Sequence, residues 1–577
     1  MEGIAAGRES LRPTVTGRHW AVASGHYLAT EAAMRVLAQG GNAVDAGVTA
    51  SMALAVLQPD IVSFAGVAPT LIYQAGTGAV TSIAGLGYWP HATDVSVLRR
   101  QGGEAVPEGL LRTVVPAAPA AHIEALSRHG SLSFEQAVMP ALQLARDGFA
   151  MYPFLARSIE SHAAQYDRYP ENASIFRPNG HTPQPGTLFR QRDLAATIEG
   201  LIVAERAARG DRQKKLRAVH DAFYRGSVAR AISDYHDRYG GFVTYEDLAD
   251  FEAPVEQSIH VRYGNFELHC CDVWCQGITF LEALRIVEAL NLKDLGHNSV
   301  GYIHHLSQAL NLAFSDREAY VGDPRFVTVP TTGLLSDAYV SAQRARIDPV
   351  RAFASMPSPG KPPGVAKFKH SPGVPGSTNT SAAPDTIYCA VIDGAGNAYS
   401  ATLSDTSFDT PIIPGTGLAV SSRGSQSRLD PEHPNAVRPG KRPRLTPTPA
   451  LVVAGDRPYM AFGTPGGDVQ CQTMLQVWLN VAEFGLPVQA AIEAARFATY
   501  NFPGSFAPHT YLPGRLCLEA GISEQVFRSL HELGHDVEYW PRFASAAGGA
   551  CAVLRDPSSG LVHAGADPRR EAYAAAW

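Results

Sequence analysis

The sequence lacks the features typical of nucleic-acid-binding, membrane-spanning and secreted proteins. Its net charge of −6, with only 18% of the 577 residues charged, leaves no basic stripe for nucleic acid. The longest uncharged run of small or apolar residues, Ala46 to Leu57, is too short to span a bilayer, and the N-terminus has no apolar signal core. We therefore expect a globular cytoplasmic protein with neither nucleic acid nor membrane as a partner.

Cysteine is also scarce. Seven cysteines, an odd number, are scattered along a long chain and form no disulfide framework, which fits a reducing compartment. The segment from His269 to Cys275 contains residue types that bind zinc, but it has no CxxC spacing and no second half. A structural role as small buried side chains is favoured here, and no cofactor or metal is expected.

The length allows about four domains or one large catalytic unit. Alanine-rich segments from Thr30 to Gln39 and from Asn42 to Leu57 predict two closely packed helices, with Thr30 as N-cap of the first. Asp45 in the second segment is expected to cap neighbouring backbone. Further helices are expected over 133–146, 277–290, 301–320 and 469–484, and strands over 69–73, 80–83, 258–263, 267–272, 450–453 and 458–462. This mixture shows no regular βαβ alternation.

A β-hairpin is the clearest local signal. Two apolar segments, 387–392 and 398–403, flank the turn sequence Asp393-Gly-Ala-Gly-Asn397. If Asp393 faces Asn397, counting back along both strands places Thr386 opposite Ser404. The hairpin therefore brings two hydroxyl groups together at its open end.

The segment before this hairpin, 356–385, is crowded with proline and glycine and predicts an exposed, unpacked linker. A threonine hydroxyl needs a base to become nucleophilic, and its own α-amine, with a reference pKa of about 7.7 to 8.0, is a known solution. Thr386 has that amine only if the 385–386 bond is cut. The local pattern fits either a self-cleaving precursor or a proline-rich surface loop that leads into an ordinary edge hairpin.

A second candidate element is the glycine-rich turn 463–468, which lies between a predicted strand and a predicted helix. Backbone N–H groups converge at such turns, so Gly466 and Gly467 are candidates for an oxyanion hole beside Thr386. No GK[ST] sequence follows, so a nucleotide-binding P-loop is not supported. A simple helix-entry turn explains the same pattern.

Several ordered motifs over nearly the whole chain together resemble the γ-glutamyltransferase family of N-terminal-nucleophile hydrolases. The motifs are Ala29-Thr-Glu-Ala-Ala33, Gly40-Gly-Asn-Ala-Val-Asp-Ala46, Leu312 to Pro324, Asp385-Thr386, Gly396-Asn397, Lys441-Arg-Pro443, Thr464-Pro-Gly-Gly467 and Gly565 to Arg570. The resemblance implies an α+β fold, a four-layer αββα sandwich. It also implies self-cleavage into a large part, 1–385, and a small part, 386–577, which form one intertwined domain. The expected assembly is a heterodimer of these parts, alone or as a dimer of heterodimers.

The resemblance also assigns roles. Thr386 is implied to be both the self-processing residue and the nucleophile, with Ser404 as a second hydroxyl and Gly466 and Gly467 as the oxyanion glycines. The substrate is implied to be a small-molecule amide, cleaved through an acyl-enzyme.

This sequence departs from the family's pattern at the residues that recognise glutamate. Segment 83–90 contains no arginine, Arg444-Leu445-Thr446 replaces a serine pair, and 421–426 lacks the expected acid. Arg423 is a candidate for holding a substrate carboxylate, and an exposed structural arginine is the alternative. Asp405 and Thr446 are further candidate binding residues.

Three functional hypotheses follow. The first is a self-cleaving threonine amidohydrolase or acyltransferase whose acyl group is not γ-glutamyl. The alternatives are a γ-glutamyl transpeptidase or glutathione hydrolase with rearranged contacts, and an unprocessed homologue that binds a ligand without turning it over.

Overall fold

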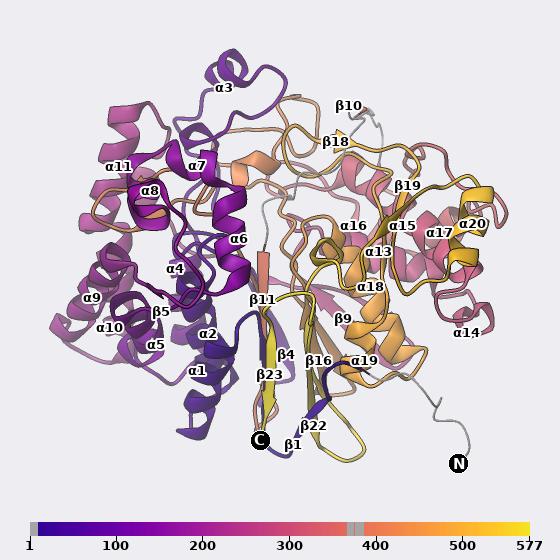
Figure 1. Ribbon diagram of the computed structural model, residues 1–577, viewed down its shortest axis with the longest axis horizontal. Helices are drawn as coiled ribbons and strands as arrows, with labels where there is room; N and C mark the ends of the chain where they lie inside the picture. Colours follow the sequence, from indigo (N-terminus) through magenta and orange to yellow (C-terminus); the bar gives the residue numbers. More distant parts are fainter. Residues whose placement is uncertain (1–9, 366–373, 376–385) are drawn as a thin grey trace.

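The computed structural model describes residues 10–365, 374–375 and 386–577. Two seven-stranded antiparallel sheets lie face to face, and a layer of helices covers the outer face of each (Figure 1). The predicted α+β fold, a four-layer αββα sandwich, is confirmed.

The first sheet, called here the β11 sheet, combines strands from both ends of the chain. Strands β11 and β12 lie at its centre, between β2 and β3, so residues on both sides of position 386 share one hydrogen-bonded sheet. Its strands in spatial order are β23 (Tyr573–Ala576), β2 (Ala21–Ser24), β11 (Thr386–Ile392), β12 (Ala398–Ser404), β3 (Thr70–Gln74), β4 (Ala79–Ile83) and β7 (Val255–Gln257).

The second sheet, called the β16 sheet, is interleaved in the same way. Its strands in spatial order are β1 (Val15–Gly17), β22 (Val562–Ala566), β21 (Cys551–Arg555), β16 (Arg457–Gly463), β15 (Ala450–Ala454), β9 (Phe266–Cys270) and β8 (Ile259–Tyr263). The two sheets pack closely: a side chain at Gly463 of β16 would collide with the Tyr388 ring of β11. Glycine is therefore required where the sheets approach each other.

The helices divide into two groups. Those on the β11 side are α1 (Tyr27–Ala38), α2 (Ala43–Leu57), α3 (Val95–Gly102), α4 (Ala118–His129), α5 (Phe134–Asp147), α6 (Pro153–Ser161), α7 (Ala163–Asp167), α8 (Pro170–Phe176), α9 (Arg192–Ala207), α10 (Arg212–Tyr224), α11 (Ser227–Tyr239) and α12 (Tyr245–Ala249). Those on the β16 side are α13 (Gly277–Val287), α14 (Leu292–Leu295), α15 (Val300–Tyr320), α16 (Thr331–Leu334), α17 (Asp337–Arg344), α18 (Val469–Ala482), α19 (Val488–Glu493) and α20 (Glu524–Glu532).

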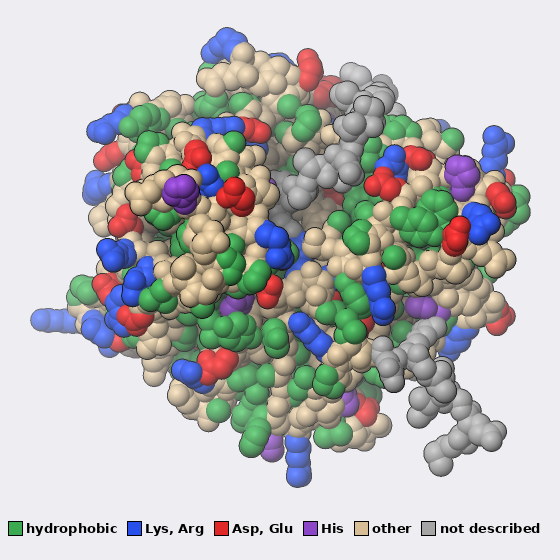
Figure 2. All heavy atoms as spheres, viewed as in Figure 1, with side chains coloured by type: hydrophobic (Ala, Val, Ile, Leu, Met, Phe, Trp, Pro, Cys, Tyr) green, Lys and Arg blue, Asp and Glu red, His purple; other side chains and the backbone are tan. Residues whose placement is uncertain are grey.

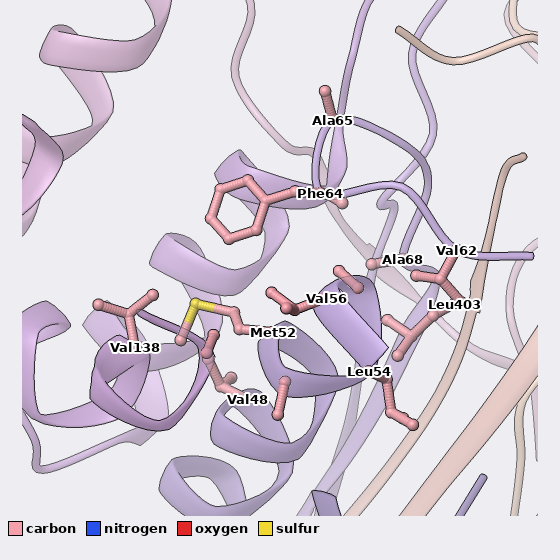
Figure 3. Packing of buried hydrophobic residues seen from close by; sticks show 14 of the residues in the cluster. Val48, Met52, Leu54, Val56, Val62, Phe64, Ala65, Ala68, Val138 and Leu403 are labelled. Carbon is pink, nitrogen blue, oxygen red and sulfur yellow. The ribbon is translucent and has the colours of Figure 1, made fainter. Parts of the chain in front are cut away.

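Helix α2 is the central helix of the first group. All of its residues are buried, because its many small side chains let it lie directly on β11 and β12 while α5 packs on its other side. Figure 3 shows Leu403 of β12 beside Leu54, and Val138 of α5 beside Met52. Asp45 completes a capping box at the start of α2, which confirms its predicted role.

The predicted start of α1 is wrong. The helix begins three residues earlier than Thr30, because the ring of His26 accepts a hydrogen bond from the Leu28 N–H and so caps it. Thr30 lies inside the helix, and its hydroxyl instead hydrogen-bonds Ser24 and the Tyr573 carbonyl.

The expectation of an unpacked linker is also wrong where the structure describes this segment. The hydroxyls of Ser315 and Tyr320 on α15 donate to the carbonyls of Pro357 and Gly360, and the Gly360 N–H donates to Asp316. Proline and glycine content does not reveal such docking. Residues 366–373 and 376–385 of the predicted linker lie outside the described residues.

All seven cysteines are buried and none forms a disulfide, as expected for small apolar side chains. Positive and negative side chains are interspersed on the face shown in Figure 2. Within the described ranges, no helix combines the length and the apolar character that crossing a membrane requires.

Candidate active site

The β11–β12 hairpin has the predicted register. Thr386, the first residue of β11, pairs with Ser404, the last residue of β12, and their hydroxyl oxygens are 3.0 Å apart. Asp393 fixes the turn, because its carboxylate accepts hydrogen bonds from Asn397 and from the N–H of Ala43 at the start of α2. The hairpin is thereby held against the helix that covers it.

Thr386 and Ser404 are both completely buried in the uncut chain. The nitrogen of Thr386 is part of a peptide bond in this state, so it cannot act as a base. The two hydroxyls are therefore already paired before the amine of Thr386 exists.

A buried cation extends this pair. The guanidinium of Arg423 donates to the Ser404 hydroxyl, forms an ion pair of 3.3 Å with Asp405, and lies 5.5 Å from the centre of the Phe506 ring. Arg423 is fully buried, so the interpretation as an exposed structural arginine is wrong. A fixed positive charge thus lies one side chain away from the Thr386 hydroxyl.

Asp405 adopts an unusual backbone conformation, with φ of +106° in a region that L-residues rarely occupy. Its carboxylate accepts hydrogen bonds of 2.9 and 3.2 Å from the backbone N–H and the hydroxyl of Ser422. These contacts hold the acid beside Arg423 and balance its charge in a buried environment.

The glycine-rich turn joins β16 to α18. Gly466 and Gly467 have positive φ values of +122° and +56°, which glycine adopts without strain. Two residues into α18, the side-chain nitrogen of Gln470 lies 3.5 Å from the Thr386 hydroxyl, so the start of this helix lies beside Thr386. Sequence analysis missed Gln470. Its position in the first turn of a helix that follows a glycine-rich turn is the signal that identifies it.

Thr446 contacts two glutamine side chains, those of Gln426 and Gln276. Its hydroxyl accepts a 2.7 Å hydrogen bond from Gln426, and its carbonyl shares the Gln276 side-chain amide with the carbonyl of Gly467, at 3.0 Å each. Thr446 thus supports the glycine-rich turn through Gln276.

Arg444, which follows the Lys441-Arg-Pro motif, forms an ion pair with the buried acid Glu318. Arg444 donates to Glu318, which also pairs with Arg428 at 2.7 Å and with Arg317 at 3.0 Å. Burial opposes the ionisation of Glu318, but Arg444, Arg428 and Arg317 outweigh it and hold its pKa well below the usual range. This motif therefore holds the fold together around the site.

No group of three potential metal ligands lies around Thr386 in the described part of the chain. The one such group comprises His260, Glu267 and His269, on the outer strands of the β16 sheet.

A four-layer αββα sandwich with a buried hydroxyl residue at the head of a central strand defines the class of N-terminal-nucleophile hydrolases. The described architecture also matches solved members of that class. The cephalosporin acylase from Bacillus halodurans superposes with a TM-score of 0.84 and 28% identity, over 100% of this chain and 99% of that one. The protein is accordingly an amide hydrolase or acyltransferase of this class.

The model of the gamma-glutamyltranspeptidase family matches residues 29–577, so the chain belongs to that family. The glutathione hydrolase-like YwrD proenzyme of Bacillus subtilis is 29% identical over 98% of this chain and 99% of its own length. The oxamate amidohydrolase proenzyme of Klebsiella pneumoniae is 28% identical over 97% of this chain and 98% of its own length. Proenzymes among the relatives mark a self-processing family.

Proposed function

We propose that this chain cleaves itself between residues 385 and 386 and that Thr386 is then the nucleophile of an amidohydrolase or acyltransferase. The observation that carries the proposal is the buried pair of Thr386 and Ser404 hydroxyls at the head of β11, 3.0 Å apart. The proenzyme relatives support the self-cleavage step.

Self-cleavage begins when the Thr386 hydroxyl oxygen attacks the carbonyl carbon of residue 385. The C–N bond breaks, the nitrogen takes up a proton to become the amine of Thr386, and an ester remains between residue 385 and the Thr386 oxygen. Water then hydrolyses this ester and releases the carboxylate of residue 385. Ser404 accepts a hydrogen bond from the attacking hydroxyl and relays its proton to the leaving nitrogen, and the nearby charge of Arg423 stabilises the negative charge that develops.

In turnover, the new amine of Thr386 takes the proton of its own hydroxyl, because an α-amine with a pKa of about 7.7 to 8.0 is a suitable base near neutral pH. The hydroxyl attacks the substrate amide, the amine component leaves, and water or another amine resolves the acyl-enzyme. The N–H groups of Gly466 and Gly467 are proposed to hold the oxyanion.

The two fragments are proposed to remain together as a heterodimer. Strands β11 and β12 of the small part lie between β2 and β3 of the large part, and β15 lies beside β9 in the other sheet. Separating the fragments would break the β11 sheet on both sides of its central hairpin, and the β16 sheet between β15 and β9.

For the acyl group we propose a short chain that ends in a carboxylate, held by Arg423. A charge-assisted contact of this kind contributes about 1.5 to 3 kcal/mol in a site shielded from water. The named substrate of the Klebsiella relative, oxamate, is such an acid amide, which supports the proposal. Asp405 and Thr446 are proposed to orient the site through Arg423 and Gln276.

A γ-glutamyl substrate is the second candidate. Asp405 favours it, because an acid beside Ser404 is suited to bind a substrate ammonium group. That acid already accepts hydrogen bonds from Ser422 and pairs with Arg423, so an ammonium would have to displace one of these partners.

The test compares hydrolysis of a γ-glutamyl anilide with that of oxamate, succinamate and glutaramate by the processed enzyme. We expect turnover of at least one monoamide and only weak turnover of the anilide. Arg423→Lys, which keeps the charge but loses the planar two-point contact, should raise KM for the monoamide more than it lowers kcat. Efficient anilide turnover that free glutamate inhibits would favour the γ-glutamyl alternative instead.

A further inference from the structure

Three potential metal ligands share one face of the hairpin formed by β8 and β9. His260 pairs directly with His269 across the two strands, and Glu267 precedes His269 by two residues. Because side chains alternate along a strand, all three project from the same face of the sheet. The hairpin forms the outer edge of the β16 sheet, with β15 between it and β16.

The ligand atoms are close together. One atom from each of the three side chains lies within 4.8 Å of the other two. The distance from His269 Nε2 to the Glu267 carboxylate is 3.0 Å, and that from His260 Nε2 to the same oxygen is 3.9 Å. His269 is buried, Glu267 half-buried and His260 exposed, so the group is anchored on one side and accessible to solvent on the other.

The surroundings of His269 prepare it for a metal. Its Nδ1 lies 2.9 Å from the hydroxyl of Ser258, which can either donate or accept a proton. If the proton of the neutral ring moves from Nε2 to Nδ1, the Nδ1–H group donates a hydrogen bond to the Ser258 hydroxyl. The Nε2 lone pair then faces Glu267, and the ring has lost no proton.

The neighbouring strand provides an apolar floor. Leu451 of β15 pairs with His269, and Val453 pairs with Glu267, and both are buried between the two sheets. An apolar wall beside mixed nitrogen and oxygen ligands strengthens their attraction to a cation.

We propose that His260, Glu267 and His269 bind a zinc ion, with a water molecule in the fourth position. Two imidazoles and one carboxylate are a ligand set that zinc favours. Zinc–ligand bonds of about 2.0 to 2.2 Å in a tetrahedron place the donor atoms about 3.3 Å apart, so the His269–Glu267 spacing already fits. Only the exposed ring of His260 has to turn inward. The ion would join the two outer strands of the sheet.

The positive charge of Arg262 opposes the binding of a cation at this site. The guanidinium nitrogen of Arg262 lies 3.9 Å from the second oxygen of Glu267, but 84% of this side chain is exposed, so it can swing away into solvent. Replacing Arg262 with alanine distinguishes a metal site from a simple ion-pair cluster. A metal site gains affinity when the competing cation is lost, whereas an ion-pair cluster is only weakened.

The experiment titrates tag-free, processed enzyme with Zn²⁺ in a calorimeter, and with Co²⁺ to follow the visible bands of a tetrahedral site. We expect one ion per chain and a rise in unfolding temperature with Zn²⁺. His260→Ala and Glu267→Gln should each weaken binding by at least about tenfold, and Ser258→Ala by about tenfold to a hundredfold. Arg262→Ala should tighten it by up to about fivefold.

His531→Ala is the matched control, because His531 is an exposed histidine on α20 outside the group. It should bind Zn²⁺ like the wild type. His260 is exposed and Glu267→Gln preserves shape, so both variants are expected to fold, and circular dichroism verifies this. The proposal is overturned if the wild type shows no saturable Zn²⁺ binding, or if His260→Ala and Glu267→Gln bind it as tightly as the wild type. Neither outcome bears on catalysis by Thr386.

Discussion

Replacing Ser404 with alanine tests the role of the hydroxyl pair in self-cleavage. In the uncut chain, the Ser404 hydroxyl lies 3.0 Å from the Thr386 hydroxyl and accepts from the guanidinium of Arg423. Because the site is completely buried, no bulk water replaces the lost group. A hydrogen bond in contact with a charged group contributes about 1.5 to 3 kcal/mol, and each 1.36 kcal/mol is a factor of ten in rate. Cleavage of Ser404→Ala should therefore be about 10 to 150 times slower.

The assay follows cleavage of the precursor made by cell-free translation, sampled over time on a denaturing gel. Ser400→Ala is the matched control, because Ser400 is a buried serine on the same strand whose hydroxyl bonds Tyr388 and the carbonyl of Ala450. It should lose stability without slowing cleavage comparably. Ser404→Thr, which keeps a hydroxyl, should recover part of the rate. Cleavage of Ser404→Ala at the wild-type rate would refute the role assigned to this residue.

Two further predictions concern the surroundings of the hydroxyl pair, and a third concerns a buried acid on α13. Gly466→Ala should lower kcat for the best amide substrate by at least about a hundredfold, because alanine is strained at a φ of +122° and the N–H would turn away from the oxyanion; unchanged kcat would remove Gly466 from the site. Gln470→Leu, which keeps the volume but loses the amide near Thr386, should slow cleavage by about tenfold, whereas Gln476→Leu on the same helix should affect mainly stability. Burial, together with Asp316, raises the pKa of Glu282 well above its usual range, so the folded state holds a proton there and loses stability as pH rises above about 4.5. Glu282→Gln should flatten this dependence, and parallel curves of unfolding temperature against pH for the two proteins would contradict the assignment.

Local signals in the sequence predict the hairpin completely. The turn Asp393-Gly-Ala-Gly-Asn397 fixes the register, and the register alone places Thr386 opposite Ser404. Helix α2 was equally predictable, because its cap and its small side chains are local features. The boundaries of most other elements fall within a few residues of their predicted positions.

Contacts between distant segments could not be predicted in this way. Arg423 is 19 residues from Ser404 and Gln470 is 84 residues from Thr386, and only the tertiary fold brings each pair together. The docking of Gly360 onto α15 depends likewise on Asp316, which nothing in the proline- and glycine-rich segment reveals. Local composition describes the segment itself and contains no information about its partner.

The mass and N-terminal sequence of the purified protein, compared with those of Thr386→Ala, test the central claim most directly. The wild type should yield two fragments, 1–385 and 386–577, that copurify as a heterodimer, and the second should begin with Thr386. The variant should remain a single chain of 577 residues. A wild-type chain that stays intact after prolonged incubation, or a variant that is cleaved at the same bond, would contradict the claim that Thr386 cleaves the chain and becomes its nucleophile.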